Sequence, residues 1–98
     1  MKSKKPMIVI EWADAHAQEE GTWVFLEDVK DKGEYIVASI GWLLDKKSGA
    51  QTGHVSIAQS LGLRDGVGDH IIHIPNAMVR AIYLLSGKKI TLKDLKSL

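Results

Sequence analysis

The chain has 98 residues, of which 45% are hydrophobic and 26% charged, which favours one globular domain with a single core and excludes an intrinsically disordered chain. It contains no cysteine, so disulfides and thiolate metal sites are excluded. The net charge is +1, but three lysines precede Pro6 and four follow Gly87. The residues between these ends include 6 basic and 11 acidic side chains, which gives them a net charge of −5.

This acidic body disfavours DNA and RNA as partners, because binding to a phosphate backbone depends on surface Lys and Arg. A membrane partner is not expected either, since the longest apolar run, residues 36–44, is far shorter than the roughly 20 residues that span a bilayer. The first six residues, MKSKKP, lack an apolar signal segment, so secretion is not expected. We expect residues 1–6 to form a flexible basic tail.

The first strand is expected over residues 7–12, MIVIEW, directly after this tail. Its apolar residues alternate, so Ile8 and Ile10 lie on one face and Val9 on the other. Residues 13–21 then fit either a short helical turn or a loop.

A half-polar insertion separates this strand from the next apolar segment. Residues 22–26, TWVFL, lead into a charged stretch that ends at Gly33 and has the composition of a turn or of one helical turn.

The strongest structural signal is a predicted β-hairpin over residues 35–60. Two runs rich in Ile, Val and aromatic residues flank a polar, glycine-containing connection at residues 45–53. Alternation places Ile40 and Trp42 on one face of the first run and Leu43 on the other, and both faces are apolar. A long strand that bends around a small barrel explains this pattern, because its two ends then face the core with different residues.

The second half of the chain predicts three further strands. The third strand, residues 54–60, alternates as a half-buried strand does, and the glycine-rich residues 61–69 form a loop. The fourth strand covers residues 70–74 and stops at Pro75, which cannot donate to a ladder.

A tight helical turn at residues 75–78 and a fifth strand at residues 79–85 complete the predicted domain, residues 7–87. Residues 88–98 form a tail or a short helix. The sequence therefore predicts a mainly β protein, a small five-stranded SH3-like or Sm-like barrel with short helical turns and a short C-terminal helix.

Short motifs along the chain resemble a known family. They are VIEWAD at residues 9–14, ASIGWL at 38–43, IAQS at 57–60, IP at 74–75 and VRAI at 79–82. They are similar to a family of small, largely uncharacterised phage-encoded proteins with VEW-x-DA, S-[IV]-G-[FW]-L, AQS and IP...I-x-x-I motifs. The resemblance implies a viral accessory protein that works in the host cytoplasm on host factors.

No catalytic signature accompanies these motifs. Asp14 and His16, with a serine such as Ser56 or Ser60, would supply the parts of a nucleophilic triad, but no elbow motif frames either serine. We therefore expect no enzyme, assign no catalytic residue, and keep Asp14 and His16 as candidate partner-binding residues.

Histidines raise the question of a metal site. His70 and His73 are close in sequence but lie on opposite faces of the predicted strand, so they cannot share one ion. No metal and no cofactor is expected.

Four residues are the candidates for ligand binding. Trp23 and Tyr35 offer rings that can stack on a ligand, and Arg64 and Arg80 are the arginines suited to a phosphate or carboxylate. Arg80 has an alternative, which is an ion pair with an acid such as Glu11 or Asp14.

The sequence thus predicts a non-enzymatic phage accessory binding protein, whose strand edges and spare apolar faces serve self-association into a homo-oligomer. Two functions remain open: a protein–protein interaction module that inhibits a host protein, and an oligomer that sequesters a small anionic signalling nucleotide of antiviral defence. An Sm-like RNA binder is a third alternative, which the acidic body disfavours.

Overall fold

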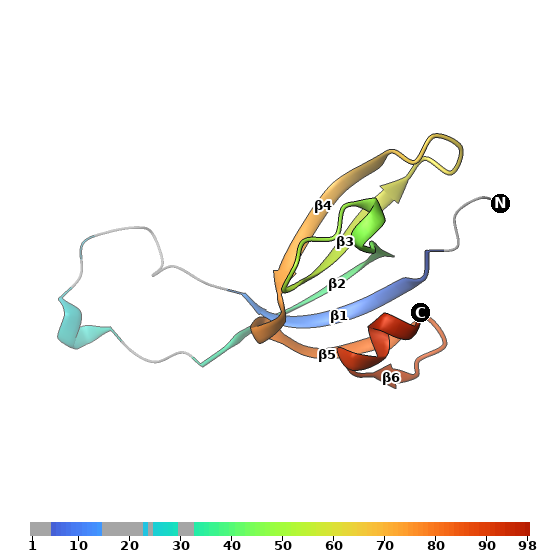
Figure 1. Cartoon of the computed structure of the whole chain (residues 1–98). Coiled ribbons are helices and arrows are strands. Elements are labelled where there is room, and N and C mark those ends of the chain that lie inside the picture. Colours follow the sequence, from blue (N-terminus) through green and yellow to red (C-terminus); the bar gives the residue numbers. More distant parts are fainter. Residues whose placement is uncertain (1–4, 15–22, 24, 30–32) are drawn as a thin grey trace.

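The computed structural model describes residues 5–14, 23, 25–29 and 33–98, and it contains one antiparallel sheet (Figure 1). The strands are β1 (Met7–Asp14), β2 (Tyr35–Leu43), β3 (His54–Leu61), β4 (Gly68–Pro75), β5 (Val79–Leu84) and β6 (Lys89–Ile90). The 3-10 turns are η2 (Leu26–Asp28), η3 (Lys46–Ser48), η4 (Asn76–Met78) and η5 (Lys93–Ser97). The prediction of a mainly β fold is confirmed.

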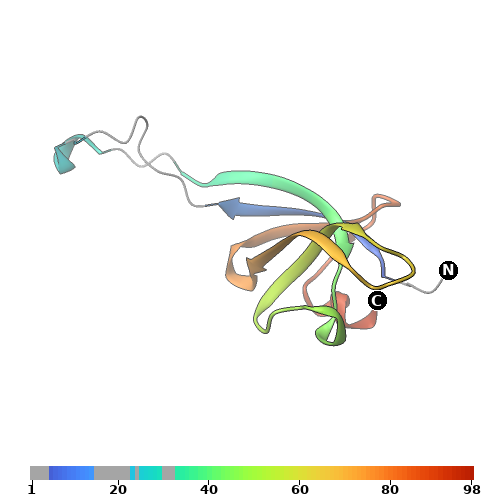
Figure 2. The same ribbon diagram turned by 90° about the horizontal axis from the view of Figure 1, so that it is seen from above.

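The six strands lie in the order β4-β3-β2-β1-β5-β6, and the sheet is open at both edges. The predicted closed barrel of five strands is therefore wrong in strand number and in closure. The sixth strand comes from the segment after Gly87, where Ile90 pairs with Ile82. Composition could not reveal this, because closure depends on twist and on which edges meet. Figure 2 shows the strong curvature of β2 within the open sheet.

One face of the curved sheet holds the core. It consists of β-branched residues that fit a pleated surface: Ile8, Ile10, Val55, Ile57, Ile74, Ile82 and Ile90. The register brings the cluster together, since Ile10 lies opposite Ile82 and Val55 opposite Ile74. Each fully buried side chain of this size contributes about 1.5–3 kcal/mol, so the cluster is the main source of stability.

The two faces of β2 have different environments. A Cβ on Gly41 would lie 2.8 Å from the carbonyl oxygen of Ala58 and 3.0 Å from the Cβ of Ile57, so only glycine allows β2 to approach β3 this closely. On the opposite face Ile36 and Ile40 are exposed.

Strand β3 departs from the predicted half-buried alternation, because Ser56 and Ala58 are buried as well as their neighbours. The connection between β2 and β3 covers Ser56. The backbone N–H of Gln51 donates to Ser56 Oγ at 3.0 Å, and that of Leu44 donates to the Ser56 carbonyl at 2.9 Å.

The C-terminal segment packs onto the sheet. Leu95 in η5 contacts the core cluster. Thr91 and Asp94 exchange hydrogen bonds, since the N–H of Thr91 donates to Asp94 Oδ2 at 2.9 Å and the N–H of Asp94 donates to Thr91 Oγ1 at 3.3 Å. Among the described residues, no helix has the length and apolar character needed to cross a membrane.

A pair of isoleucines on adjacent strands tests this assignment of the core. We expect Ile10→Ala to lower the free energy of unfolding by about 2–5 kcal/mol, because it leaves a cavity in the core. Ile40→Ala, the matched control on the exposed face, should cost about 1 kcal/mol or less. Urea denaturation measures both, and equal losses would contradict the assignment.

Candidate functional site

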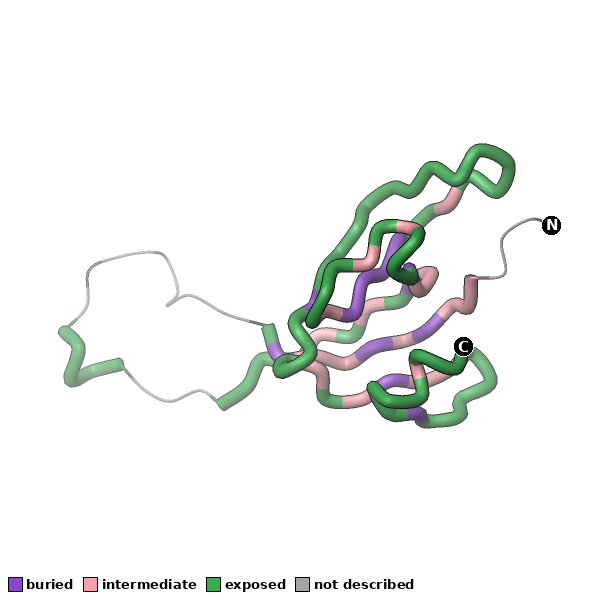
Figure 3. Tube along the Cα trace, viewed as in Figure 1, coloured by how far each residue is buried: buried purple, intermediate pink, exposed green. Residues whose placement is uncertain are grey.

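The most exposed large apolar side chains lie on a segment between β1 and β2, which we call the apolar arm: Trp23 and residues 25–29. The exposed fractions are 102% for Trp23, 87% for Leu26 and 76% for Phe25. Figures 1 and 3 show the arm projecting beyond the ends of both strands, away from the rest of the molecule. No described residue of the sheet covers these three side chains.

The arm has local order of its own. Its single 3-10 turn, η2, is closed by the N–H of Asp28, which donates to the Phe25 carbonyl at 2.9 Å, and by the N–H of Val29, which donates to the Leu26 carbonyl at 3.1 Å. The turn carries two acidic side chains, Glu27 and Asp28. The described residues of the arm therefore combine large apolar side chains with negative charge.

An ion pair lies where β2 begins and β5 starts. Arg80 Nε donates to Glu34 Oε1 at 2.8 Å, its Nη2 also binds the Glu34 carboxylate, and its Nη1 donates to the Ala77 carbonyl at 2.8 Å. The hydrogen bond from Arg80 lowers the pKa of Glu34; burial opposes this effect, and the charge of Arg80 adds to the lowering. Arg80 thus pairs with an acid, as predicted, but the acid is Glu34 and not Glu11 or Asp14, and its guanidinium is already occupied by a carboxylate.

The structure divides the predicted binding residues between two places. Tyr35 and Asp14 are register partners at the end of the β1–β2 ladder, next to the ion pair of Arg80 with Glu34. Trp23 lies on the apolar arm. His16 lies outside the described residues. Arg64 lies far from them, in the loop between β3 and β4, so the predicted set does not form one site.

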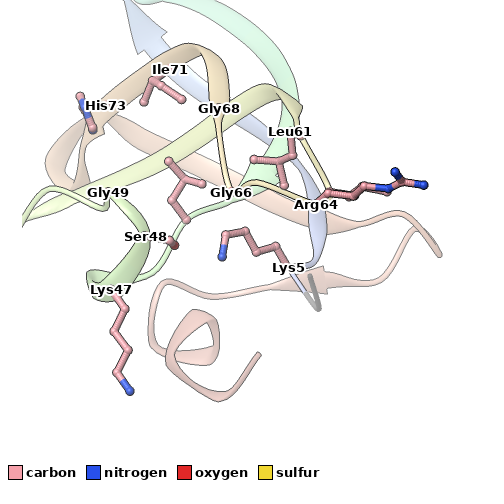
Figure 4. Close-up of a pocket in the computed structure, with 13 residues that line it drawn as sticks. Lys5, Lys47, Ser48, Gly49, Leu61, Arg64, Gly66, Gly68, Ile71 and His73 are labelled. Carbon is pink, nitrogen blue, oxygen red and sulfur yellow. The ribbon is translucent and has the colours of Figure 1, made fainter. Parts of the chain in front are cut away.

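Arg64 lines a pocket of about 760 Å³ between η3 and the β3–β4 loop. The charged side chains in its lining are Lys5, Lys47 and Arg64, with His73 beside them and no carboxylate among them. In Figure 4 the Lys5 nitrogen lies over the hollow, whereas the ends of Lys47 and Arg64 point outward from its rim.

A second hollow of about 900 Å³ runs from η3 to the C-terminal segment, and we call it the basic groove. Its apolar lining residues are Leu43, Leu44, Val55, Leu92, Leu95 and Leu98, and its cationic ones are Lys5, Lys46, Lys47 and Lys96. Asp45 is the one acid in this lining. Its carboxylate accepts from Ser48 Oγ at 2.7 Å and from the N–H of Lys47 at 3.1 Å. The bond from Ser48 is the main cause of its lowered pKa.

A serine–histidine pair contributes one residue to each hollow, since Ser56 lines the basic groove and His73 lines the Arg64 pocket. Ser56 Oγ and His73 Nδ1 are 2.6 Å apart, and Ser56 Oγ also accepts from the N–H of Gln51. Ser56 is buried, and among the described residues no carboxylate hydrogen-bonds to His73. The pair ties the loop to β3 and β4, and the described part of the chain supplies no third member of a triad beside it.

Sequence reasoning named Ser56 but missed His73 as its partner. The signal that could have found it is the β3–β4 register, which pairs the two positions across the sheet. His70 instead contacts its neighbour Asp69, with Nδ1 and Oδ2 2.9 Å apart. In the part of the chain that the structure describes, no three His, Asp or Glu side chains gather as metal ligands.

Comparison with known proteins identified no relative of this chain. No protein-family model matches the chain, and neither the curated proteins nor the solved structures contain a match. Function therefore has to be inferred from the arm, the pocket and the groove.

The ion pair between Arg80 and Glu34 predicts that the stability of the protein depends on pH. The lowered pKa of Glu34 means that the pair adds stability above the ordinary glutamate pKa of about 4.3 and that this stability is lost as the pH falls through the lowered pKa. We expect Glu34→Gln to lower the melting temperature at pH 7, and the difference to shrink in acid. Glu27→Gln, on the arm, is the control. A Glu34→Gln difference that stays constant with pH would contradict the assignment.

Proposed function

We propose that this protein is a non-enzymatic binding protein that recognises a protein partner with its apolar arm. The observation that carries the proposal is the exposure of Trp23, Phe25 and Leu26, at 102%, 76% and 87%. Contiguous exposed apolar surface of this kind marks interaction sites in soluble proteins, and Trp is enriched among the residues that dominate binding energy.

The chemistry of the arm defines the surface that it would bind. Trp23 and Phe25 each bring about 150–250 Å² of ring surface, which is stabilised when it enters an apolar groove. Glu27 and Asp28 lie in the same turn, so a groove with basic residues at its rim fits best. The partner would thus be a protein with an apolar cleft and a positive rim.

The motifs at residues 9–14, 38–43 and 57–60 support a more specific context. They resemble those of phage-encoded accessory proteins, so we propose that the partner is a host factor in the host cytoplasm. The strand succession β4-β3-β2-β1-β5, with η4 between β4 and β5, supports a relation to the SH3-like and Sm-like proteins at the level of strand order.

Arm variants test this function. In a pull-down from host lysate, Trp23→Ala should weaken the retained partner about 30-fold, because the loss of one dominant interface side chain costs about 2 kcal/mol or more. Ile40→Ala removes an exposed apolar side chain from the sheet and is the control. Retention that is the same for both variants would contradict the proposal.

The Arg64 pocket favours a second candidate function, the binding of a small anionic ligand such as a nucleotide. Its volume lies in the range of small-molecule sites, and its charged lining residues are all cationic. Lysine binds phosphate as a point charge and arginine through a planar fork, so Lys47 and Arg64 at the rim could turn onto a phosphate.

Ligand binding would raise the melting temperature of the protein. We expect a rise with pyrophosphate, ADP or a cyclic dinucleotide, and we expect Arg64→Glu to abolish it. Lys89→Glu, which removes a cation from β6 outside the pocket, should leave the rise unchanged. The candidate fails if none of the three ligands gives a rise.

A further inference from the structure

We propose that the apolar arm of one copy docks in the basic groove of a second copy. The proposal rests on the proposed function, because it uses the arm as the recognition element. The partner is a second copy of the same protein, which occupies the arm until a target protein is present.

The two surfaces are complementary in polarity. The groove offers leucine side chains from two parts of the chain, among them Leu44, Leu92 and Leu98, and the last two of these are exposed. The arm offers Trp23 and Phe25, which are uncovered. Joining them removes apolar surface of both from water, which stabilises the contact.

The two surfaces are also complementary in charge. Four lysines and one aspartate line the groove, and the aspartate is held by Ser48 and by the backbone of Lys47. The described residues of the arm carry Glu27 and Asp28 and no cation. Opposite charges at the rim of an interface fix its register and suppress wrong partners.

The arm and the groove are apart within one copy. Trp23 is 102% exposed and Phe25 is 76% exposed. Figures 1 and 2 show the arm extended away from the body of the molecule, which contains η3. Both surfaces are therefore available to a second copy. An arm that folds back into the groove of its own chain would protect residues 25–29 at every protein concentration, whereas docking between copies protects them only as the concentration rises.

A reciprocal exchange covers both surfaces at once. In a two-fold dimer each copy donates its arm and receives the arm of the other, so the contact between arm and groove is made twice. The two aromatic rings of each arm, counted with the groove surface that they cover, bury about 1,200–2,000 Å² in such a dimer. This matches the area of stable interfaces, about 1,200–2,000 Å². A target protein would compete for the same arm.

Charge reversal tests the contact in full-length protein. We expect Glu27→Lys with Asp28→Lys, and separately Lys46→Glu with Lys47→Glu, to raise the dimer dissociation constant at least tenfold, since each puts like charges together. An equimolar mixture of the two variants should dimerise again, because it pairs a basic arm with an acidic groove and an acidic arm with a basic groove. Sedimentation velocity and native mass spectrometry measure the mass.

The control is Lys88→Glu with Lys89→Glu, which removes two cations that do not line the groove and should leave the dimer intact. Dimers of either reversed variant alone, or a mixture that stays monomeric, would overturn the proposal. If the wild-type protein is monomeric while Trp23→Ala still loses a target in the pull-down, the second copy is excluded as partner and the recognition function of the arm stands. If the Trp23→Ala variant keeps both the dimer and the target, both proposals fail.

Discussion

The β1–β2 ladder is the constraint on which the rest of the structure depends. It is continuous over eight residue pairs, from Met7 opposite Trp42 to Asp14 opposite Tyr35. Only its first part lies over the isoleucine core, where Ile8 and Ile10 are buried. Backbone hydrogen bonds and cross-strand pairs hold the two strands together beyond the core. The apolar arm therefore leaves the molecule at a defined place and at a distance from the core.

Two surfaces with different chemical character, the apolar arm and the basic groove, lie apart on one molecule. At the arm end, the ion pair between Arg80 and Glu34 links the start of β2 to β5, and large apolar side chains face water. On the body of the molecule, η3 and the C-terminal segment line the basic groove, with Asp45 held inside the turn by Ser48. The arm presents apolar and acidic side chains and the groove presents apolar and basic ones, so the contact that we propose between copies would satisfy both.

The strands could be predicted from the sequence because their signals are local. Alternation identified Ile8 and Ile10 as one face of β1, and the polar connection after Leu44 marked the hairpin. The open edges and the strand β6 could not be predicted, since they depend on how distant strands meet. The burial of Ser56 could not be predicted for the same reason, because a connecting loop covers it. The candidate binding residues do not form one site, and this also could not be predicted from the sequence. Arg80, for example, pairs with Glu34 and not with an acid of β1.

The claim that the arm is uncovered in one chain and covered by a second is tested most directly by amide hydrogen exchange. Exchange at residues 25–29 should be fast in dilute protein and should slow as the protein concentration rises, because docking protects the η2 backbone. The residues of the core strands should exchange slowly at every concentration. Protection of residues 25–29 that is already present in the dilute monomer, or fast exchange at all concentrations, would contradict it.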